Sequence, residues 1–298
     1  MSRRISLKDL TPQALVDQEW GLADLKKDKP NNWPDYVQVF IDEARRTHAT
    51  EIAYVGRGFE SCGVYELFKD GKSLHALIRI QNGSLPMPTN HCDGLLPFYS
   101  QEVFELPGDV HPDLSKPSNN EHPYGIRINV MPKVLRLPEL ANEAGPVNTH
   151  LPHWDELVHY QEKIRQQIDS RLAMQGQAAV DNHPGNEGFY YTAKKQYIPV
   201  VFDPGSAPMN NYPAAIAPGS PTERARMKNI LRYHTKGNAA WMKPEIWKNM
   251  RHEIADDAKR LYDGKPTHYA RRMETVSAEV PIAALEATTR KVGVREVG

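Results

Sequence analysis

The first 56 residues change from helical spacing of apolar positions to the pattern of a strand. Thr11-Pro12 predicts the start of a helix that ends near residue 26, because threonine caps helices well and proline suits a first turn. A second helix is predicted from Pro34 to about His48. Its apolar stripe consists of Val37, Phe40, Ile41 and Ala44. Glu51–Gly56, which follows, predicts a strand.

Strand signals continue around the dipeptide Asp70-Gly71. Asp-Gly suits a tight primed turn, and it lies between Val64–Phe68 and Leu74–Ile80, so these segments predict a β-hairpin. Further along the chain, Ile126–Val130 predicts another short strand. Val134–Leu137 is the expected partner of that strand.

Two proline-rich tracts interrupt the predicted elements. Residues 82–125 carry seven of the 24 prolines and contain one strand-like segment, Pro97–Leu106. Residues 181–221 form the second tract, with a short predicted strand at Tyr197–Phe202. Loop-rich tracts of this length are uncommon unless they are functional, disordered or held by a partner.

The later part of the chain predicts helices. His153–Met174 has a long one-sided apolar pattern. Ser220-Pro221-Thr222-Glu223 is a capping box with a first-turn proline, and it predicts a helix that ends at Gly237. Another helix begins at Pro244 and is closed by Asp263-Gly264-Lys265-Pro266, because glycine followed by proline ends helices.

Together these elements predict an α+β protein. It has N-terminal helices, a small and mostly antiparallel sheet with long Pro-rich loops, and a C-terminal helical region. Three regions are expected: 1–150 with the antiparallel sheet, 151–220 with the long helix and an irregular Pro-rich tract, and 221–298 as a basic helical region. Within the last region, residues 267–298 are ambiguous. A chain of 298 residues suggests one large or two modest domains.

The apolar pattern and the cysteine content favour a protein of a reducing compartment. The first ten residues lack the apolar run of a secretory signal, and no segment approaches the roughly 20 apolar residues that span a bilayer. Cys62 and Cys92 do not make a disulfide scaffold or a CxxC zinc site. We therefore expect a cytoplasmic protein, or one in the host cytoplasm or virion if it is viral, with no secretion, membrane partner or cofactor.

The net charge of zero conceals a bipolar chain. Residues 221–298 hold 16 Lys and Arg against 10 Asp and Glu, which gives +6. The first 220 residues hold 21 against 27, which gives −6. The two parts of the chain therefore have opposite charge.

Four cations one helical turn apart stand out in the basic region: Arg224, Lys228, Arg232 and Lys236. Like charges at this spacing repel by about 0.2–0.5 kcal/mol per pair, so the pattern suggests negative charge against that face. Lys248, Arg271 and Arg272 extend the predicted partner-binding set. Three interpretations stay open: a solvated face, an acidic surface of another protein subunit in an oligomer or particle, and nucleic-acid phosphates.

Two histidines and two carboxylates suggest a metal site at the start of the long helix. The candidate ligands are His150, His153, Asp155 and Glu156. The spacing is not HExxH, and Pro152 lies between the two histidines. Asp181-Asn182-His183 with Glu187 is a weaker set of the same kind.

Two other motifs fail in their sequence context. Gly56-Arg57-Gly58 follows a predicted strand but leads into another strand, which argues against a dinucleotide loop. Cys92, between His91 and Asp93, lacks the electropositive neighbours that activate a thiol, so we expect it to be structural.

No catalytic motif fits its context, and the two long tracts need neighbours to hold them. The leading hypothesis is therefore a non-enzymatic structural or assembly protein of a larger complex, for example a viral (phage) virion component. The first alternative is nucleic-acid binding through the basic C-terminal helices. The second is a metal-dependent hydrolase that uses the histidines and carboxylates near residue 150.

Overall fold

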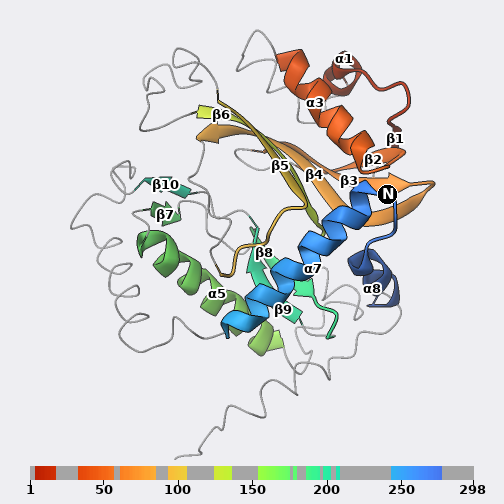
Figure 1. Ribbon diagram of the computed structural model, residues 1–298. Coiled ribbons are helices and arrows are strands. Elements are labelled where there is room, and N and C mark those ends of the chain that lie inside the picture. Colours follow the sequence, from red (N-terminus) through yellow and green to blue (C-terminus); the bar gives the residue numbers. More distant parts are fainter. Residues whose placement is uncertain are drawn as a thin grey trace, which may run out of the picture. The chain divides into compact units, whose positions relative to one another are not determined.

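The structure, a computed structural model, is an α+β protein with a mostly antiparallel sheet, as the sequence predicts (Figure 1). It describes residues 4–17, 33–56, 61–84, 93–105, 124–135, 154–174, 177–179, 186–194, 197–202, 206–208 and 243–276. The chain divides into two compact units, each built from separated segments. Unit 1 comprises Met1–Met87, Pro97–Lys133 and Ile254–Ala270, and unit 2 comprises Pro88–Leu96, Val134–Glu253 and Arg271–Gly298. The three-region division drawn from the sequence stays a prediction.

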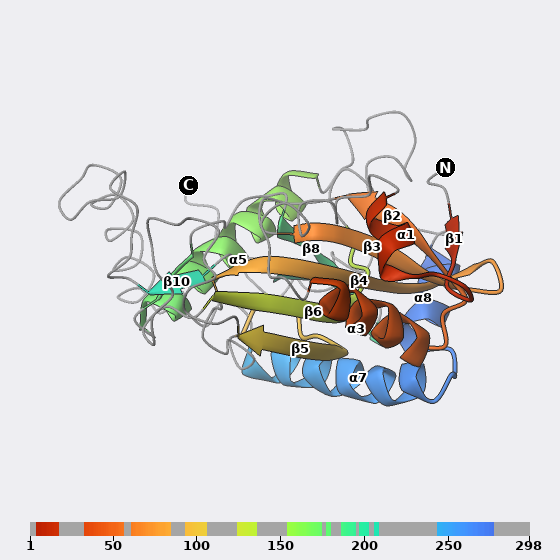
Figure 2. The ribbon, with the colours of Figure 1, turned by 90° about the horizontal axis from the view of Figure 1, so that it is seen from above.

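Unit 1 is organised around a six-stranded antiparallel sheet with the order β1-β2-β3-β4-β6-β5 (Figures 1 and 2). The strands are β1 (Arg4–Ser6), β2 (Glu51–Gly56), β3 (Ser61–Lys69), β4 (Lys72–Ser84), β5 (Ser100–Glu105) and β6 (Tyr124–Pro132). The Asp70-Gly71 hairpin is confirmed, with φ of 50° and 77° at these two residues. Positive φ at both central positions is the requirement of a type I′ turn.

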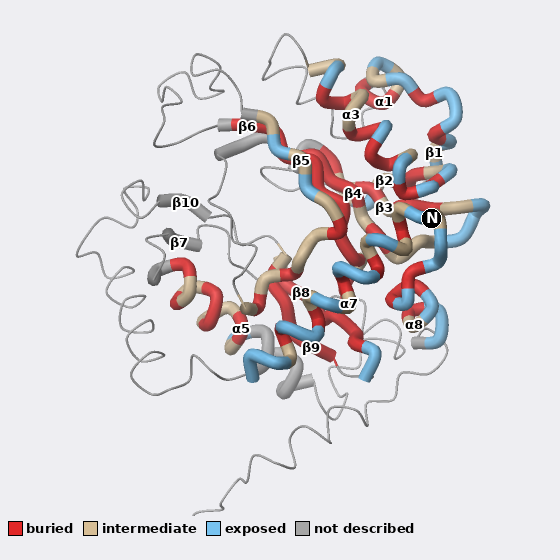
Figure 3. Tube along the Cα trace, in the orientation of Figure 1, coloured by how far each residue is buried: buried red, intermediate tan, exposed pale blue. Residues whose placement is uncertain are grey.

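Helices α1 (Pro12–Asp17) and α3 (Trp33–Arg46) also belong to unit 1. The predicted stripe of α3 is confirmed, since all four of its residues are fully buried (Figure 3). Phe40 packs against Tyr65 of β3 and Tyr36 packs against Phe104 of β5, each with 5.3 Å between ring centroids. The helix therefore covers one face of the sheet, and burial of its apolar stripe holds it there.

The C-terminal part of α7 (Pro244–Tyr262) lies in unit 1 and ends as the sequence predicts. Gly264 has φ of 70°, and backbone N–H groups of Gly264 and Lys265 donate to the carbonyls of Leu261 and Arg260 at 3.0 and 2.9 Å. This is a Schellman cap, which needs a residue in the left-handed region. A Cβ on Gly264 would also lie 3.0 Å from the ring of His48, so glycine allows a close approach to the end of α3.

Unit 2 contains α5 (Trp154–Met174) and two small sheets. Strands β8 (Glu187–Tyr191) and β9 (Tyr197–Val201) form a hairpin in which every residue of both strands is buried (Figure 3). The second sheet pairs β7 (Gln177–Ala179) with β10 (Ser206–Pro208). The last helix, α8 (His268–Val276), begins in unit 1 and continues into unit 2.

The expected pairing of Val134–Leu137 with Ile126–Val130 is wrong. Both edges of β6, which contains Ile126–Val130, are already hydrogen-bonded, to β4 and to β5. Leu135 instead bonds to Phe189 of β8, with N···O distances of 3.1 and 2.7 Å. None of the helices in the described ranges is long and apolar enough to span a membrane.

Candidate functional site

The structure describes three of the seven predicted partner-binding cations. Arg224, Lys228, Arg232 and Lys236 lie outside the described residues. Lys248 on α7 and Arg271 on α8 are exposed. Arg272, directly after Arg271, is partly buried and has acidic and phenolic partners within unit 2.

The cations of unit 2 differ in whether they have a partner in the described part of the chain. Arg272 lies 3.1 Å from a carboxylate oxygen of Glu253 and donates to the Tyr190 hydroxyl at 3.2 Å. Arg251 pairs with Asp93 at 2.7 Å. Each of these two pairs joins segments that are distant in sequence. Lys248 and Arg271, by contrast, make no hydrogen bond or ion pair with any part of the chain that the structure describes.

The structure does not describe the side chains of the predicted metal ligands, so that site stays a prediction. His150 and His153 lie outside the described residues, and so do the side chains of Asp155 and Glu156, although both residues belong to the first turn of α5. Of the weaker set, Glu187 is described: its buried carboxylate bonds to Arg165 Nε at 2.5 Å. That carboxylate therefore serves to hold α5 against the β8–β9 hairpin.

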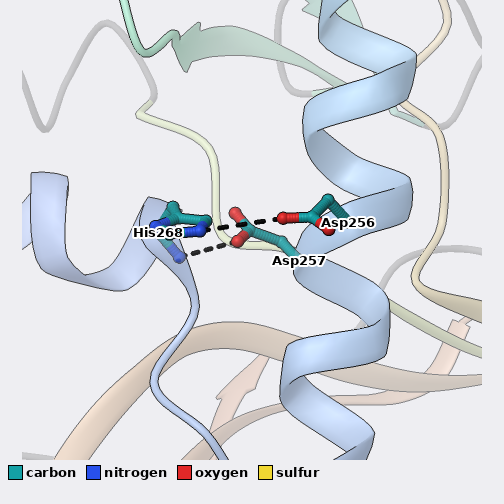
Figure 4. Close-up of side chains that lie close together, drawn as sticks. All are labelled: Asp256, Asp257 and His268. Carbon is teal, nitrogen blue, oxygen red and sulfur yellow. Dashed lines mark hydrogen bonds and ion pairs between the residues drawn. The ribbon is translucent and has the colours of Figure 1, made fainter.

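A cluster that the sequence analysis did not predict lies in unit 1 where α7 meets α8. Asp256, Asp257 and His268 converge there, as Figure 4 shows, and their potential ligand atoms all lie within 4.8 Å of one another. Asp257 is 1% exposed, whereas the side chains of Asp256 and His268 are 61% and 50% exposed. The cluster therefore combines one buried carboxylate with two groups that solvent can reach.

Asp257 also starts helix α8. Its two carboxylate oxygens accept the backbone N–H groups of His268 and Tyr269 at 2.6 and 2.9 Å. The Thr267 hydroxyl oxygen accepts the N–H of Ala270 at 2.9 Å. The first-turn amides of α8 are thereby satisfied, and the carboxylate of Asp257 is fixed in position.

A second polar network in unit 1 surrounds the buried Glu43 of α3. Glu43 accepts hydrogen bonds from the hydroxyls of Ser100 and Tyr262, and its other oxygen lies 2.7 Å from a guanidinium nitrogen of Arg46. Burial raises the pKa of Tyr262, and the hydrogen bond to Glu43 raises that pKa further. The tyrosine therefore stays a neutral donor near pH 7, and the network ties α7 to α3 and β5.

The sheet face opposite α3 carries a third polar group on the central strands β4 and β6. It consists of Arg79, Gln81, Arg127 and Asn129, all buried. Arg79 is paired across the strands with Asn129, and Gln81 with Arg127. The Asn129 amide donates to Gln81 Oε1 at 3.2 Å. These side chains alternate with Ile78, Ile80 and Ile128 and so lie on the other face of the pleat.

Comparison with known proteins supplies no relative, since no family model and no curated protein matches this sequence.

Proposed function

We propose that this chain is a non-enzymatic assembly protein whose copies bind one another through opposite charge. The observation that carries the proposal is the pair of exposed cations, Lys248 and Arg271, which have no acidic partner among the described residues. Their neighbours in sequence, such as Arg251 and Arg272, are paired within unit 2. Lys248 and Arg271 are therefore available to an external anionic surface.

A second copy of the chain can provide this anionic surface, because the two parts of the chain carry opposite charge. Residues 221–298 carry +6 and residues 1–220 carry −6, so the basic part of one copy is complementary to the acidic part of another. Two different patches that bind each other form a head-to-tail contact, which repeats into a ring or a filament. A subunit of a particle such as a virion is the narrower form of this proposal.

The buried carboxylates support a structural role. Glu43, Glu187 and Asp257 are each buried, and each is bonded to a helix or strand other than its own. In each case the group joins one helix to another helix or strand. Each of these three carboxylates therefore holds together elements of one unit: Glu43 and Asp257 within unit 1, and Glu187 within unit 2.

Sedimentation velocity of the full chain tests the proposal. At about 0.05 M salt we expect association that increases with protein concentration, and at about 0.5 M salt we expect it to be lost through screening. The double variant Lys248→Gln/Arg271→Gln should weaken association. Lys72→Gln, which replaces an exposed cation at the start of β4 in unit 1, is the matched control and should not weaken association. A chain that stays monomeric at low salt and high concentration overturns the proposal.

Nucleic-acid binding is the alternative outcome, and it would replace the proposal of self-association. The same two cations would then contact phosphates, and the affinity for a labelled DNA duplex would fall with salt and with the double variant. Duplex binding combined with a monomeric free protein would replace self-association by nucleic-acid recognition.

A further inference from the structure

We infer that Asp256, Asp257 and His268 form a binding site for a divalent transition-metal ion such as zinc or manganese. Protein ligands lie about 2.0–2.2 Å from such an ion, so two ligand atoms on one ion are about 3.3–3.6 Å apart at tetrahedral angles and at most about 4.4 Å apart. The three ligand atoms already lie within 4.8 Å of one another. A movement of about 1 Å in the exposed side chains of Asp256 and His268 therefore brings all three ligand atoms to one ion.

Asp257 provides the fixed ligand. An ionised carboxylate has about four lone-pair positions, and the backbone amides of His268 and Tyr269 use two of them. The remaining positions are available to a metal. Backbone hydrogen bonds that orient a ligating carboxylate are typical of the groups around a metal ligand, and they reduce the entropy lost on binding.

Asp256 and His268 provide the adjustable ligands. The distance between His268 Nε2 and the nearer Asp256 oxygen is 3.7 Å, which is too long for a hydrogen bond. Both groups are therefore close without being bonded to each other. Their exposure lets water complete the coordination sphere, as in metal sites that keep open positions.

The ligand types select the class of metal. Magnesium and calcium prefer a sphere made of oxygen atoms alone, whereas one imidazole with two carboxylates suits zinc, manganese or iron. Two aspartates bring a charge of −2 to the site, and a divalent cation would relieve their repulsion. Bound metal would also link α7 to α8 directly.

The competing explanation is that Asp257 acts as a helix cap alone and that Asp256 and His268 form a weak surface pair. Isothermal titration of the full chain, first stripped with a chelator, distinguishes the two. With zinc or manganese chloride we expect saturable binding, and with magnesium chloride much weaker binding. Thermal unfolding in the same buffers should show stabilisation by the metals that bind.

Two variants test the inference, at Asp256 and at His268. Both side chains are exposed, so we expect their replacement to leave the fold intact. Asp256→Asn and His268→Gln should each weaken metal binding by about tenfold or more, with an unchanged unfolding temperature in chelator. His252→Gln, which replaces an exposed histidine on α7, is the control and should leave the affinity unchanged. The inference is overturned if the wild type binds no metal, or if the Asp256 and His268 variants bind metal as tightly as the wild type does.

Discussion

Unit 1 and unit 2 each bury a glutamate, and each surrounds it with different chemistry. Glu43 of unit 1 accepts two neutral hydroxyls, from Ser100 and Tyr262, in addition to its contact with Arg46. Glu187 of unit 2, whose side chain is fully buried, bonds to the guanidinium of Arg165. Hydroxyl donors are neutral near pH 7, and salt has little effect on their hydrogen bonds. The strength of an ion pair, by contrast, depends on both pH and salt concentration.

The difference extends to the rest of each unit. Unit 1 has a continuous six-stranded ladder and a helix whose apolar stripe is fully buried. Unit 2 has two-stranded sheets, and ion pairs such as Asp93–Arg251 and Glu253–Arg272 join its distant segments. We therefore expect unit 1 to be most sensitive to loss of apolar volume and unit 2 to loss of a single cation.

The largest effect should come from the core of unit 1. Phe40→Ala removes a fully buried ring and should lower the free energy of unfolding by about 3–5 kcal/mol. Hydrogen exchange should then accelerate in β3, β4 and β6 more than in β8 and β9. Val39→Ala, a partly exposed neighbour on the same helix, is the control and should cost much less. Equal acceleration in both units would break the comparison.

Unit 2 should show the converse pattern. Arg165→Met keeps the aliphatic stem but leaves the buried charge of Glu187 without this partner, at a cost of about 2–3 kcal/mol. Exchange should accelerate first in β8 and β9. The double variant Arg165→Met/Glu187→Gln should recover part of the loss, and Glu162→Gln, exposed on the same helix, should be near neutral. No recovery in the double variant would mean that the cost is not electrostatic.

A smaller effect is expected from the hydroxyl network of unit 1. Tyr262→Phe removes a donor from Glu43 and should destabilise the protein by about 1–2 kcal/mol in urea unfolding near neutral pH. Tyr54→Phe is the matched control, because its ring packs on Tyr65 and the hydroxyl has no partner among the described residues. Similar losses in the two variants would assign the effect to packing instead.

The smallest expected effect is a pH dependence. The pKa of Tyr262 in the folded state lies above the ordinary tyrosine value of about 10. Its contribution to stability is therefore complete below that pH and is lost as the pH rises toward the folded-state pKa. Between pH 8 and about 10.5, the wild type should lose up to about 1 kcal/mol more than Tyr262→Phe in urea unfolding. If the wild type and Tyr262→Phe lost the same stability over this pH range, the predicted direction of the pH dependence would be wrong.

Local signals explain which elements the sequence predicts. The stripe of α3, the Asp70-Gly71 hairpin and the glycine cap of α7 each depend on residues within one or two turns of one another. The strand β1 was missed because its three residues are held by pairing with β2, as between Arg4 and Ala53. Helix α8 was missed because part of its cap comes from Asp257, which is 11 residues before the first amide that it bonds.

The candidate sites show the same limit. The exposed cations Lys248 and Arg271 were in the predicted set, because helical spacing and local charge are visible in a sequence. The Glu43 network could not be predicted, since it joins residues 57, 162 and 219 positions apart. The metal-ligand cluster did leave one signal: two adjacent aspartates precede the Gly264–Pro266 turn, and a histidine stands two residues after it.

The discontinuous make-up of unit 1 has a consequence for biosynthesis. Glu43 and its partner Tyr262 are 219 residues apart, so a ribosome that adds about 5–20 residues per second makes the tyrosine roughly 10–45 s after the glutamate. During that interval the nascent sheet lacks the segment Ile254–Ala270, which completes unit 1. Chaperone binding to the nascent chain should therefore persist until translation has passed this segment, and a stop codon before it should release a product prone to aggregation.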